Sequence, residues 1–349
     1  MNAIDKFCVW FTIKSHKEGD KNMESKNNEI FIKDRADPFI TKGSDGYYYF
    51  TASYPMYGKD DPEGYDRIIL RRSKTIEGLK TAEEKTIWDE KNSLTAHRFI
   101  WAPEIHEIGG RWYVFFAASG SSDNVWDINC HAIVCKGIDP YNDTWEDKGK
   151  LQCPDDDDFS FTRFSLDMTH FSHLGHHYLL WAQHGSNSNV YIAEINPSEP
   201  YRTICKAILF TKPEYDWERV NIPVNEGPAV MKHGGRIFVA FSASATGPEY
   251  CVGLIYADEN ADLLDMSNWT KLDYPLLCSD DLVGEYGPGH NSFVKDENGN
   301  WLIVYHSRDE RCFKKECEHA NGDPLYDPCR STHIRKIKWD ENGLPIFNA

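Results

Sequence analysis

The stretch Arg35-Ala-Asp-Pro-Phe-Ile, followed closely by Tyr47-Tyr-Tyr-Phe-Thr-Ala-Ser, decides the fold of this chain. It places a carboxylate in an apolar setting and then, about ten positions later, a dense run of aromatic and β-branched residues. A similar pattern returns four times. The further copies begin at Trp101-Ala-Pro-Glu-Ile-His, Ser165-Leu-Asp-Met-Thr-His-Phe, Asn225-Glu-Gly-Pro-Ala-Val and Gly289-His-Asn-Ser-Phe-Val.

The five copies recur at a nearly fixed interval, which is typical of a repeat architecture. The register positions are 65, 65, 59 and 64 residues apart, and they are Asp37, Ala102, Asp167, Glu226 and His290. Units of this length fit the four-stranded blades of a β-propeller. We therefore predict an all-β, single-domain, five-bladed β-propeller over residues 29–349, preceded by a disordered lead-in over residues 1–28.

Short turns separate the first and second runs of several units. Gly109-Gly110, Gly234-Gly235 and Glu297-Asn298-Gly299-Asn300 each stand just before a second run. Tight hairpins need positive φ, which glycine and asparagine adopt readily. The sequence therefore predicts that the runs are consecutive antiparallel strands.

The net charge of −17, from 38 basic and 55 acidic residues, argues against nucleic acid or an anionic membrane as a partner. No segment approaches the apolar length of a membrane-spanning helix. Residues 7–13 form a short apolar run without a cleavage site after it, so we expect a cytoplasmic protein, with secretion left open.

Cys130, Cys135 and Cys251 lie inside predicted strands, which favours reduced, buried thiols over disulfides.

Three carboxylates occupy the register positions and are expected to converge. The innermost strand of each propeller blade lines the central channel, so Asp37, Asp167 and Glu226 would meet there. Burying three acids together is unfavourable unless function requires them. Two carboxylates that flank a sugar linkage carry out glycoside hydrolysis, and a third can adjust the pKa of the acid.

The local sequences suggest which carboxylate does what. The proline after Asp37 predicts an extended backbone there, and Arg35 and Lys33 could keep this carboxylate ionised, as a general base requires. Glu226 has apolar neighbours that would raise its pKa, as a general acid requires. Asp167 is then the modulator of that pKa.

These motifs resemble those of glycoside hydrolase family 43, whose members are five-bladed propellers. The resemblance covers the chain from Arg35 to Pro345. It rests on the six motifs Arg35-Ala-Asp-Pro-Phe-Ile, Trp101-Ala-Pro-Glu-Ile-His, Ser165-Leu-Asp-Met-Thr, Asn225-Glu-Gly-Pro, Tyr286-Gly-Pro-Gly-His-Asn-Ser-Phe and His306-Ser-Arg. It implies anomeric inversion, with Asp37 as base, Glu226 as acid and Asp167 as pKa modulator.

The resemblance also implies roles for further residues. His290 matches a position near which relatives hold a calcium or similar ion, mostly through water, and the alternative is a hydrogen-bonded histidine without metal. Arg308 matches an arginine that reaches the active site and could bind a sugar hydroxyl or Asp167. Trp101 is a candidate platform for a sugar ring, although a strand tryptophan can also be core. No organic cofactor is implied.

Two groups of residues have no role that follows from the motifs. Glu104 is a further acid near the second register position, and His106 follows it. The last unit departs from the family pattern because it contains a cluster, Cys312, Cys317, His319 and Cys329. Zinc is conceivable there, but the spacing is not that of a common zinc motif, so we expect plain thiols or a local disulfide.

The sequence thus predicts an inverting glycosidase that removes terminal α-L-arabinofuranosyl residues from neutral, plant-derived oligosaccharides of arabinan or arabinoxylan. A β-D-xylosidase, or a bifunctional enzyme of the same fold and mechanism, is the nearest alternative. An endo-arabinanase and a non-catalytic carbohydrate-binding propeller are more remote. The sequence leaves the oligomeric state open.

Overall fold

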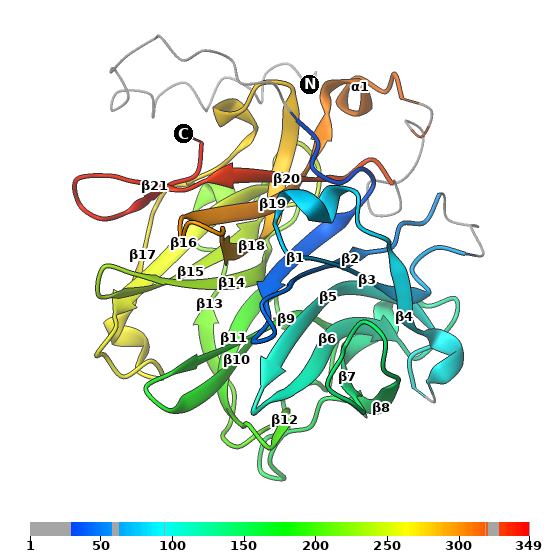
Figure 1. Cartoon of the computed structure of the whole chain (residues 1–349). Coiled ribbons are helices and arrows are strands. Elements are labelled where there is room, and N and C mark those ends of the chain that lie inside the picture. Colours follow the sequence, from blue (N-terminus) through cyan, green and yellow to red (C-terminus); the bar gives the residue numbers. More distant parts are fainter. Residues whose placement is uncertain (1–28, 58–62, 94, 318, 320–327, 349) are drawn as a thin grey trace.

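Five antiparallel sheets surround a central axis in the computed structural model (Figure 1). The structure describes residues 29–57, 63–93, 95–317, 319 and 328–348, so the predicted lead-in over residues 1–28 lies outside them. The arrangement confirms the predicted all-β, single-domain, five-bladed propeller. No helix among the described residues is long and apolar enough to cross a membrane.

The first three blades follow one another along the chain, and each runs outward from its first strand. The first contains β1 (Ala36–Lys42), β2 (Tyr48–Ser53), β3 (Arg67–Ser73) and β4 (Lys85–Asp89). The second contains β5 (Arg98–Ile108), β6 (Arg111–Ser119), β7 (Ile128–Cys135) and β8 (Trp145–Lys150). The third contains β9 (Ser165–His173), β10 (His176–His184), β11 (Ser188–Asn196), β12 (Glu199–Thr203) and β13 (Ile208–Thr211).

The last two blades complete the ring. The fourth contains β14 (Asn225–His233), β15 (Arg236–Ala243), β16 (Cys251–Asp258) and β17 (Thr270–Lys271). The fifth contains β18 (Glu285–Lys295), β19 (Trp301–Asp309) and β20 (Ser331–Lys336), and β21 (Lys338–Trp339) and β22 (Pro345–Ile346) form a small hairpin after it. The short helix α1 (Glu310–Phe313) follows β19. Single 3₁₀ turns are η3 (Glu77–Lys80), η4 (Glu90–Asn92), η5 (Val125–Asp127), η6 (Asp216–Glu218), η7 (Met266–Asn268) and η8 (Ser279–Asp281).

The aromatic runs form the second strands of the blades, and they are buried on both faces. All six residues of β2 are buried, as are eight of the nine in β6. A blade packs between two neighbours, so its middle strands contact apolar side chains on each side and read as continuous apolar runs. The first and second blades, for example, share a core that includes Tyr49, Ile68 and Trp112.

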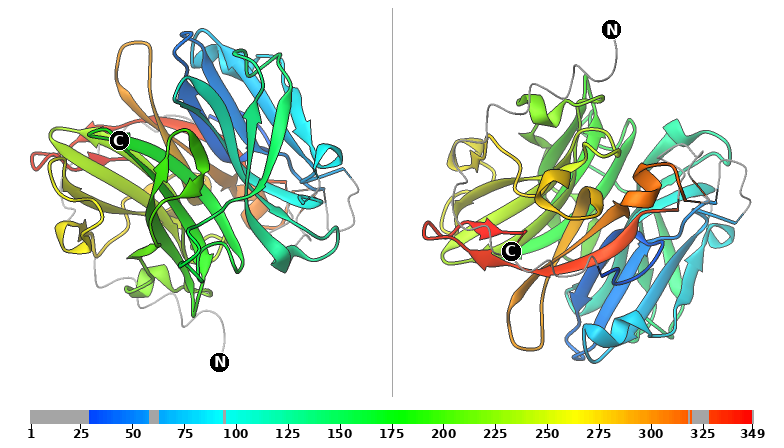
Figure 2. Two further views of the ribbon diagram at one scale, coloured as in Figure 1. Left: turned by 90° about the horizontal axis from the view of Figure 1, so that it is seen from below. Right: turned by 90° about the horizontal axis from the view of Figure 1, so that it is seen from above.

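The beginning of the described chain closes the ring. Ile32 bridges to Thr332 in β20, and the backbone N–H of Phe31 donates to the Thr332 carbonyl at 2.8 Å. The Thr332 N–H donates back to the Ile32 carbonyl at 2.9 Å. These bonds pair the outer edge of β20 with the start of the described chain. Figure 2 shows the last blade (orange to red) beside the first blade (blue).

Each innermost strand carries an irregularity in its pairing at an equivalent place, which identifies a repeated β-bulge. One residue of every bulge has a left-handed backbone. These residues are Asp37 (φ 53°), Ala102 (45°), Asp167 (57°), Gly227 (53°) and His290 (42°). The residue of the fourth bulge that is equivalent to Asp37 and Asp167 is therefore Gly227. This register position was predicted at Glu226, one residue earlier in the chain.

The extended backbone predicted for Asp37 is also wrong, since its φ is 53°. A left-handed conformation costs an L-residue about 1–2 kcal/mol, so something must offset it. At four bulges the backbone N–H of the left-handed residue donates to a side chain of the preceding blade. The pairs are Ala102 with Ser53 Oγ (2.8 Å), Gly227 with Asp167 Oδ2 (3.0 Å), His290 with Ser242 Oγ (2.7 Å) and Asp37 with His306 Nδ1 (3.0 Å).

The local predictions for turns and thiols are confirmed. Gly109, Gly110, Gly234, Gly235 and Gly299 all have positive φ at the hairpins. The buried strand cysteines predicted to be reduced are free thiols.

We predict that Gly227→Ala lowers the free energy of unfolding by more than Gly299→Ala does. Both substitutions place an L-residue at positive φ, which costs about 1–2 kcal/mol. Only at Gly227 would the new Cβ also press on a neighbour, 3.3 Å from His290 Nδ1, whereas Gly299 has open space. Urea unfolding of both variants measures the difference, and equal losses would show that the His290 contact adds nothing.

Candidate active site

Asp37 is buried among polar partners from the first and fifth blades. Its Oδ2 accepts a hydrogen bond from Ser53 Oγ at 2.6 Å, and Arg330 Nη1 lies 3.3 Å from its Oδ1. Burial opposes ionisation, but the positive charge of Arg330 holds the pKa of Asp37 well below its ordinary value. Asp37 is therefore a carboxylate at neutral pH.

The cation beside Asp37 is not one of those predicted from the sequence. Arg35 pairs instead with Glu84, and Lys33 Nζ lies 3.7 Å from Asp34. Arg35 and Lys33 were predicted because they lie close to Asp37 in the sequence. Arg330 belongs to the last blade and is distant from Asp37 in the sequence.

Asp167 comes from the third blade and is almost completely buried. Its Oδ2 accepts the Gly227 backbone N–H at 3.0 Å, so it fixes the backbone next to Glu226. Burial raises the pKa of Asp167 well above its ordinary value, and the charges of Glu226 and Asp37 raise it further.

Glu226 precedes the fourth bulge and is partly exposed. Burial by the surrounding protein raises its pKa to about 7, while the hydrogen bond from Tyr250 Oη to its Oε1, 2.8 Å long, acts in the opposite direction. The cluster thus combines an ionised Asp37 with two acids, Asp167 and Glu226, whose raised pKa values favour the protonated form. Groups with separated pKa values are what acid–base chemistry requires.

His290 stands between two of the carboxylates. Its Nδ1 lies 3.5 Å from Asp37 Oδ1 and 3.7 Å from Asp167 Oδ2. Burial lowers the pKa of His290, although Asp37 opposes that effect, and burial lowers the pKa of His306 to about 3. Both imidazoles are therefore neutral at pH 7.

The two remaining predicted residues lie in β5 of the second blade and β19 of the fifth. Trp101 precedes the second bulge, beside Tyr65 and Phe99 with ring centroids 5.8 and 6.2 Å away. Its indole Nε1 is buried and finds no partner among the described residues. Arg308 is buried at the end of β19 and donates from Nη1 to the Thr246 carbonyl at 2.6 Å.

Glu104 and His106 form a pair farther along β5. His106 Nε2 lies 2.9 Å from Glu104 Oε2, and its ring lies 5.6 Å from the ring of His170. Both partners are buried. The pairing satisfies two polar groups that the motifs had left without a role.

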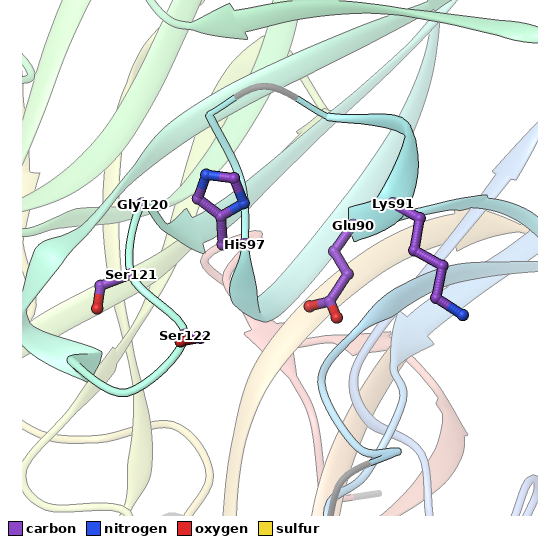
Figure 3. Close-up of a pocket in the computed structure, with 6 residues that line it drawn as sticks. All are labelled: Glu90, Lys91, His97, Gly120, Ser121 and Ser122. Atoms are coloured by element: carbon purple, nitrogen blue, oxygen red, sulfur yellow. The ribbon is translucent and has the colours of Figure 1, made fainter.

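A polar pocket of about 550 Å³ opens between the first and second blades (Figure 3). It is lined by Glu90, Lys91, His97, Gly120, Ser121 and Ser122. His97 lies just before β5, shortly ahead of the bulge at Ala102. The pocket and the carboxylate cluster therefore lie toward the same end of the propeller.

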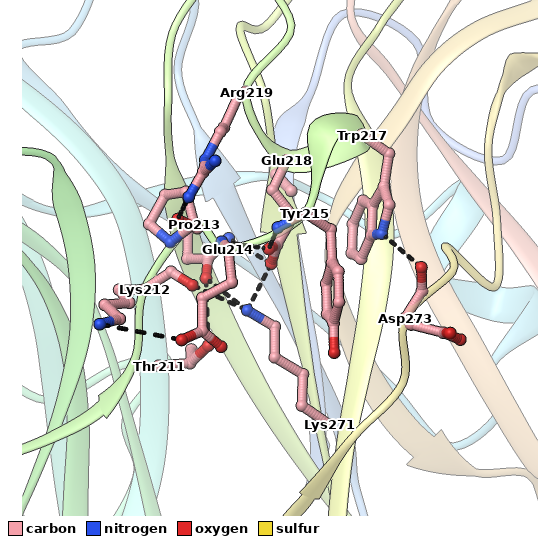
Figure 4. Close-up of polar contacts among 12 residues, drawn as sticks. Thr211, Lys212, Pro213, Glu214, Tyr215, Trp217, Glu218, Arg219, Lys271 and Asp273 are labelled. Atoms are coloured by element: carbon pink, nitrogen blue, oxygen red, sulfur yellow. Dashed lines mark hydrogen bonds and ion pairs between the residues drawn. The ribbon is translucent and has the colours of Figure 1, made fainter. Parts of the chain in front are cut away.

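A buried ion pair supports the strand that carries Glu226 (Figure 4). Lys271 Nζ lies 2.6 Å from Glu218 Oε1, and the Glu218 side chain is 0% exposed. The backbone N–H groups of Glu214 and Tyr215 donate to Glu218 Oε2. Asn225, directly before Glu226, donates to Glu218 Oε1 at 3.0 Å.

Sequence reasoning missed Arg330, Tyr250, His306 and Ser53 as partners of the acids. Ser53 ends β2 and Tyr250 directly precedes β16, and neither belongs to a distinctive motif. His306 stood within a quoted motif, but the motif gave no hint that it accepts the Asp37 N–H. Arg330 follows a turn in the last unit and has no equivalent mark in the other units.

Comparison with known proteins identifies the family of this chain. The sequence model of glycosyl hydrolases family 43 matches residues 27–345. The extracellular exo-α-(1→5)-L-arabinofuranosidase of Streptomyces avermitilis is 42% identical over 318 residues, which cover 90% of this chain and 61% of that protein. α-L-Arabinofuranosidase 43 of Humicola insolens is 40% identical, with 90% and 62% covered. The chain thus spans about three fifths of the length of these relatives.

Solved structures show the same fold. The crystal structure of α-L-arabinofuranosidase from Lactobacillus brevis has a TM-score of 0.80 and 39% identity, with 93% of this chain and 97% of that chain covered. A thermostable family-43 glycoside hydrolase gives a TM-score of 0.68 at 19% identity, with 92% and 95% covered. The second likeness concerns the fold alone.

We predict that Lys271→Met destabilises the protein by about 3 kcal/mol, because it leaves the Glu218 carboxylate buried without its cation. Lys212→Met is the matched control. Its ammonium lies 3.8 Å from Glu214 on the surface, where an ion pair contributes little. Urea unfolding measures both, and a loss at Lys271 no larger than that at Lys212 would contradict the role given to the buried pair.

Proposed function

The chain belongs to glycosyl hydrolases family 43, and from this premise we propose that it is an inverting, exo-acting α-L-arabinofuranosidase. The observation that carries the proposal is the contrast between the pKa values of two neighbouring acids. Arg330 holds the pKa of Asp37 low, while burial raises that of Glu226 to about 7. The identity of the sugar rests on relatives that are about 40% identical and are named as arabinofuranosidases.

In the proposed mechanism Asp37 is the general base. Its carboxylate takes a proton from a water molecule, which attacks the anomeric carbon of a terminal arabinofuranosyl residue. Inverting enzymes perform this displacement in a single step, with the water on the face opposite the leaving group. The Ser53 hydroxyl and Arg330 orient the carboxylate for that task.

Glu226 is the proposed general acid. It gives its proton to the glycosidic oxygen as the bond to the sugar breaks. Asp167 is the modulator, because it fixes the backbone at Gly227 and competes with Glu226 for protons. Trp101 and Arg308 are proposed to contact the sugar.

A calcium ion near His290 also stays a proposal. Beside His290, the side-chain oxygen of Asn291 is buried and unpaired among the described residues. Calcium takes six to eight oxygen ligands, so an ion at this place would be held mainly through water. Such an ion would add positive charge near the acids.

The substrate we propose is a neutral plant-derived oligosaccharide of arabinan or arabinoxylan, since two relatives are named exo-α-(1→5)-L-arabinofuranosidases. Both relatives are also named extracellular. The cytoplasmic location expected from the sequence therefore stays a prediction.

The function is tested by initial rates on aryl α-L-arabinofuranoside and aryl β-D-xyloside, side by side. We expect a clear preference for the arabinoside, and a loss of at least about 1,000-fold in Asp37→Ala, because attack then lacks its base. Comparable rates would indicate a bifunctional enzyme. No activity on either substrate would overturn the proposal in favour of an endo-acting or binding role.

We also predict that Tyr250→Phe moves the alkaline limb of the kcat/KM profile upward by about one pH unit. The Tyr250 hydrogen bond favours the ionised form of Glu226, so its removal raises the pKa of about 7 further. The acid then stays protonated to higher pH. Tyr48→Phe removes a hydroxyl that bonds to the Lys295 carbonyl and is the control. A limb that stays in place would exclude Glu226 as the titrating acid.

A further inference from the structure

Three thiols meet at the end of the fifth blade, outside the carboxylate cluster. Cys312 lies in α1, and Cys317 and Cys329 lie in the connection from there to β20. Their sulfur atoms all lie within 4.8 Å of one another, and those of Cys317 and Cys329 are 3.5 Å apart. All three residues are partly buried thiols.

This spacing matches that of thiolates around one metal ion. Zinc binds sulfur at about 2.3 Å in a tetrahedral arrangement, which sets neighbouring sulfur atoms roughly 3.8 Å apart. The sulfur atoms of Cys317 and Cys329 lie close to this spacing although 12 residues separate them, and the third sulfur lies within 4.8 Å of both. The sequence spacing argued against zinc only because it matched no common motif.

We propose that Cys312, Cys317 and Cys329 bind a zinc ion as three thiolates. Each thiol loses its proton on binding, and no oxidation takes place. The His319 ring packs on Tyr57 with centroids 5.4 Å apart, and it is not among the mutually close ligand atoms. Among the described residues, the ligands within reach of one another are thus these three thiolates.

The ion would join two segments that lead to the carboxylate cavity. Cys312 follows shortly after Arg308, and the Asp309 side chain caps the intervening helix by accepting the Cys312 N–H at 2.9 Å. Cys329 directly precedes Arg330, the partner of Asp37. Zinc would therefore hold the chain on both sides of this connection without contacting the acids.

The first test is the metal content of the full chain, purified with reductant and with zinc in the medium. We expect one zinc ion per chain by elemental mass spectrometry. Cys317→Ser should weaken zinc binding by more than about 100-fold, because even the loss of outer partners costs ten- to a hundred-fold. Cys205→Ser is the matched control, a partly buried thiol that accepts the Glu194 N–H elsewhere in the fold.

Cobalt substitution gives a readout that does not depend on activity. Three thiolates around Co²⁺ should produce sulfur-to-metal charge-transfer bands in the near ultraviolet, weakened in Cys317→Ser and unchanged in Cys205→Ser. In the wild-type chain, zinc should also protect these three cysteines from alkylation until a chelator is added. This second measurement keeps the test valid if the Cys317→Ser variant fails to fold.

Three results would overturn the proposal. Equal zinc content in wild type and Cys317→Ser would mean an adventitious ion only. A non-reduced tryptic peptide that links Cys317 to Cys329 and persists in zinc-grown protein would mean a disulfide. Absence of zinc together with unprotected thiols would mean plain cysteines. None of these results bears on hydrolysis by Asp37 and Glu226, so the two proposals fail independently.

Discussion

The left-handed residue in each innermost strand is the constraint on which the rest of this structure depends. Four of the five are not glycine, so each carries the steric penalty of positive φ. The N–H of the bulge is bound in four cases by a side chain of the preceding blade. In these four cases a side chain of one blade therefore fixes the bulge of the next blade. A channel-lining position becomes a place where a polar side chain is both aimed and fixed.

The protonation states of the three clustered acids follow from this arrangement. Asp37, Asp167 and Glu226 cannot all ionise at close quarters without compensation. Arg330 brings a full positive charge to Asp37, whereas burial keeps His290 and His306 neutral. Arg330 also lowers the pKa of Glu226, but burial outweighs that effect, so Glu226 and Asp167 retain protons. The asymmetry between base and acid comes from the position of a single guanidinium group.

The fold and the three acids could be predicted from the sequence because both depend on local patterns that repeat along the chain. The interval of about 64 residues and the aromatic runs were enough for a five-bladed propeller. The repeat did not show that Gly227, not Glu226, occupies the fourth bulge, since a shift of one residue hardly changes the interval. It also could not show Arg330 or Tyr250, which reach the acids only through the packing of strands from other parts of the chain.

The contacts that join the first blade to the last also place Arg330 beside Asp37. Arg330 immediately precedes β20, where Thr332 pairs with Ile32 at the start of the described chain. The Thr332 hydroxyl also donates to the Arg35 carbonyl at 2.8 Å, two residues before Asp37. The hydrogen bonds that join the first and last blades therefore bring Arg330 within 3.3 Å of Asp37. A chain with four blades in place would still lack the charge that keeps its base ionised.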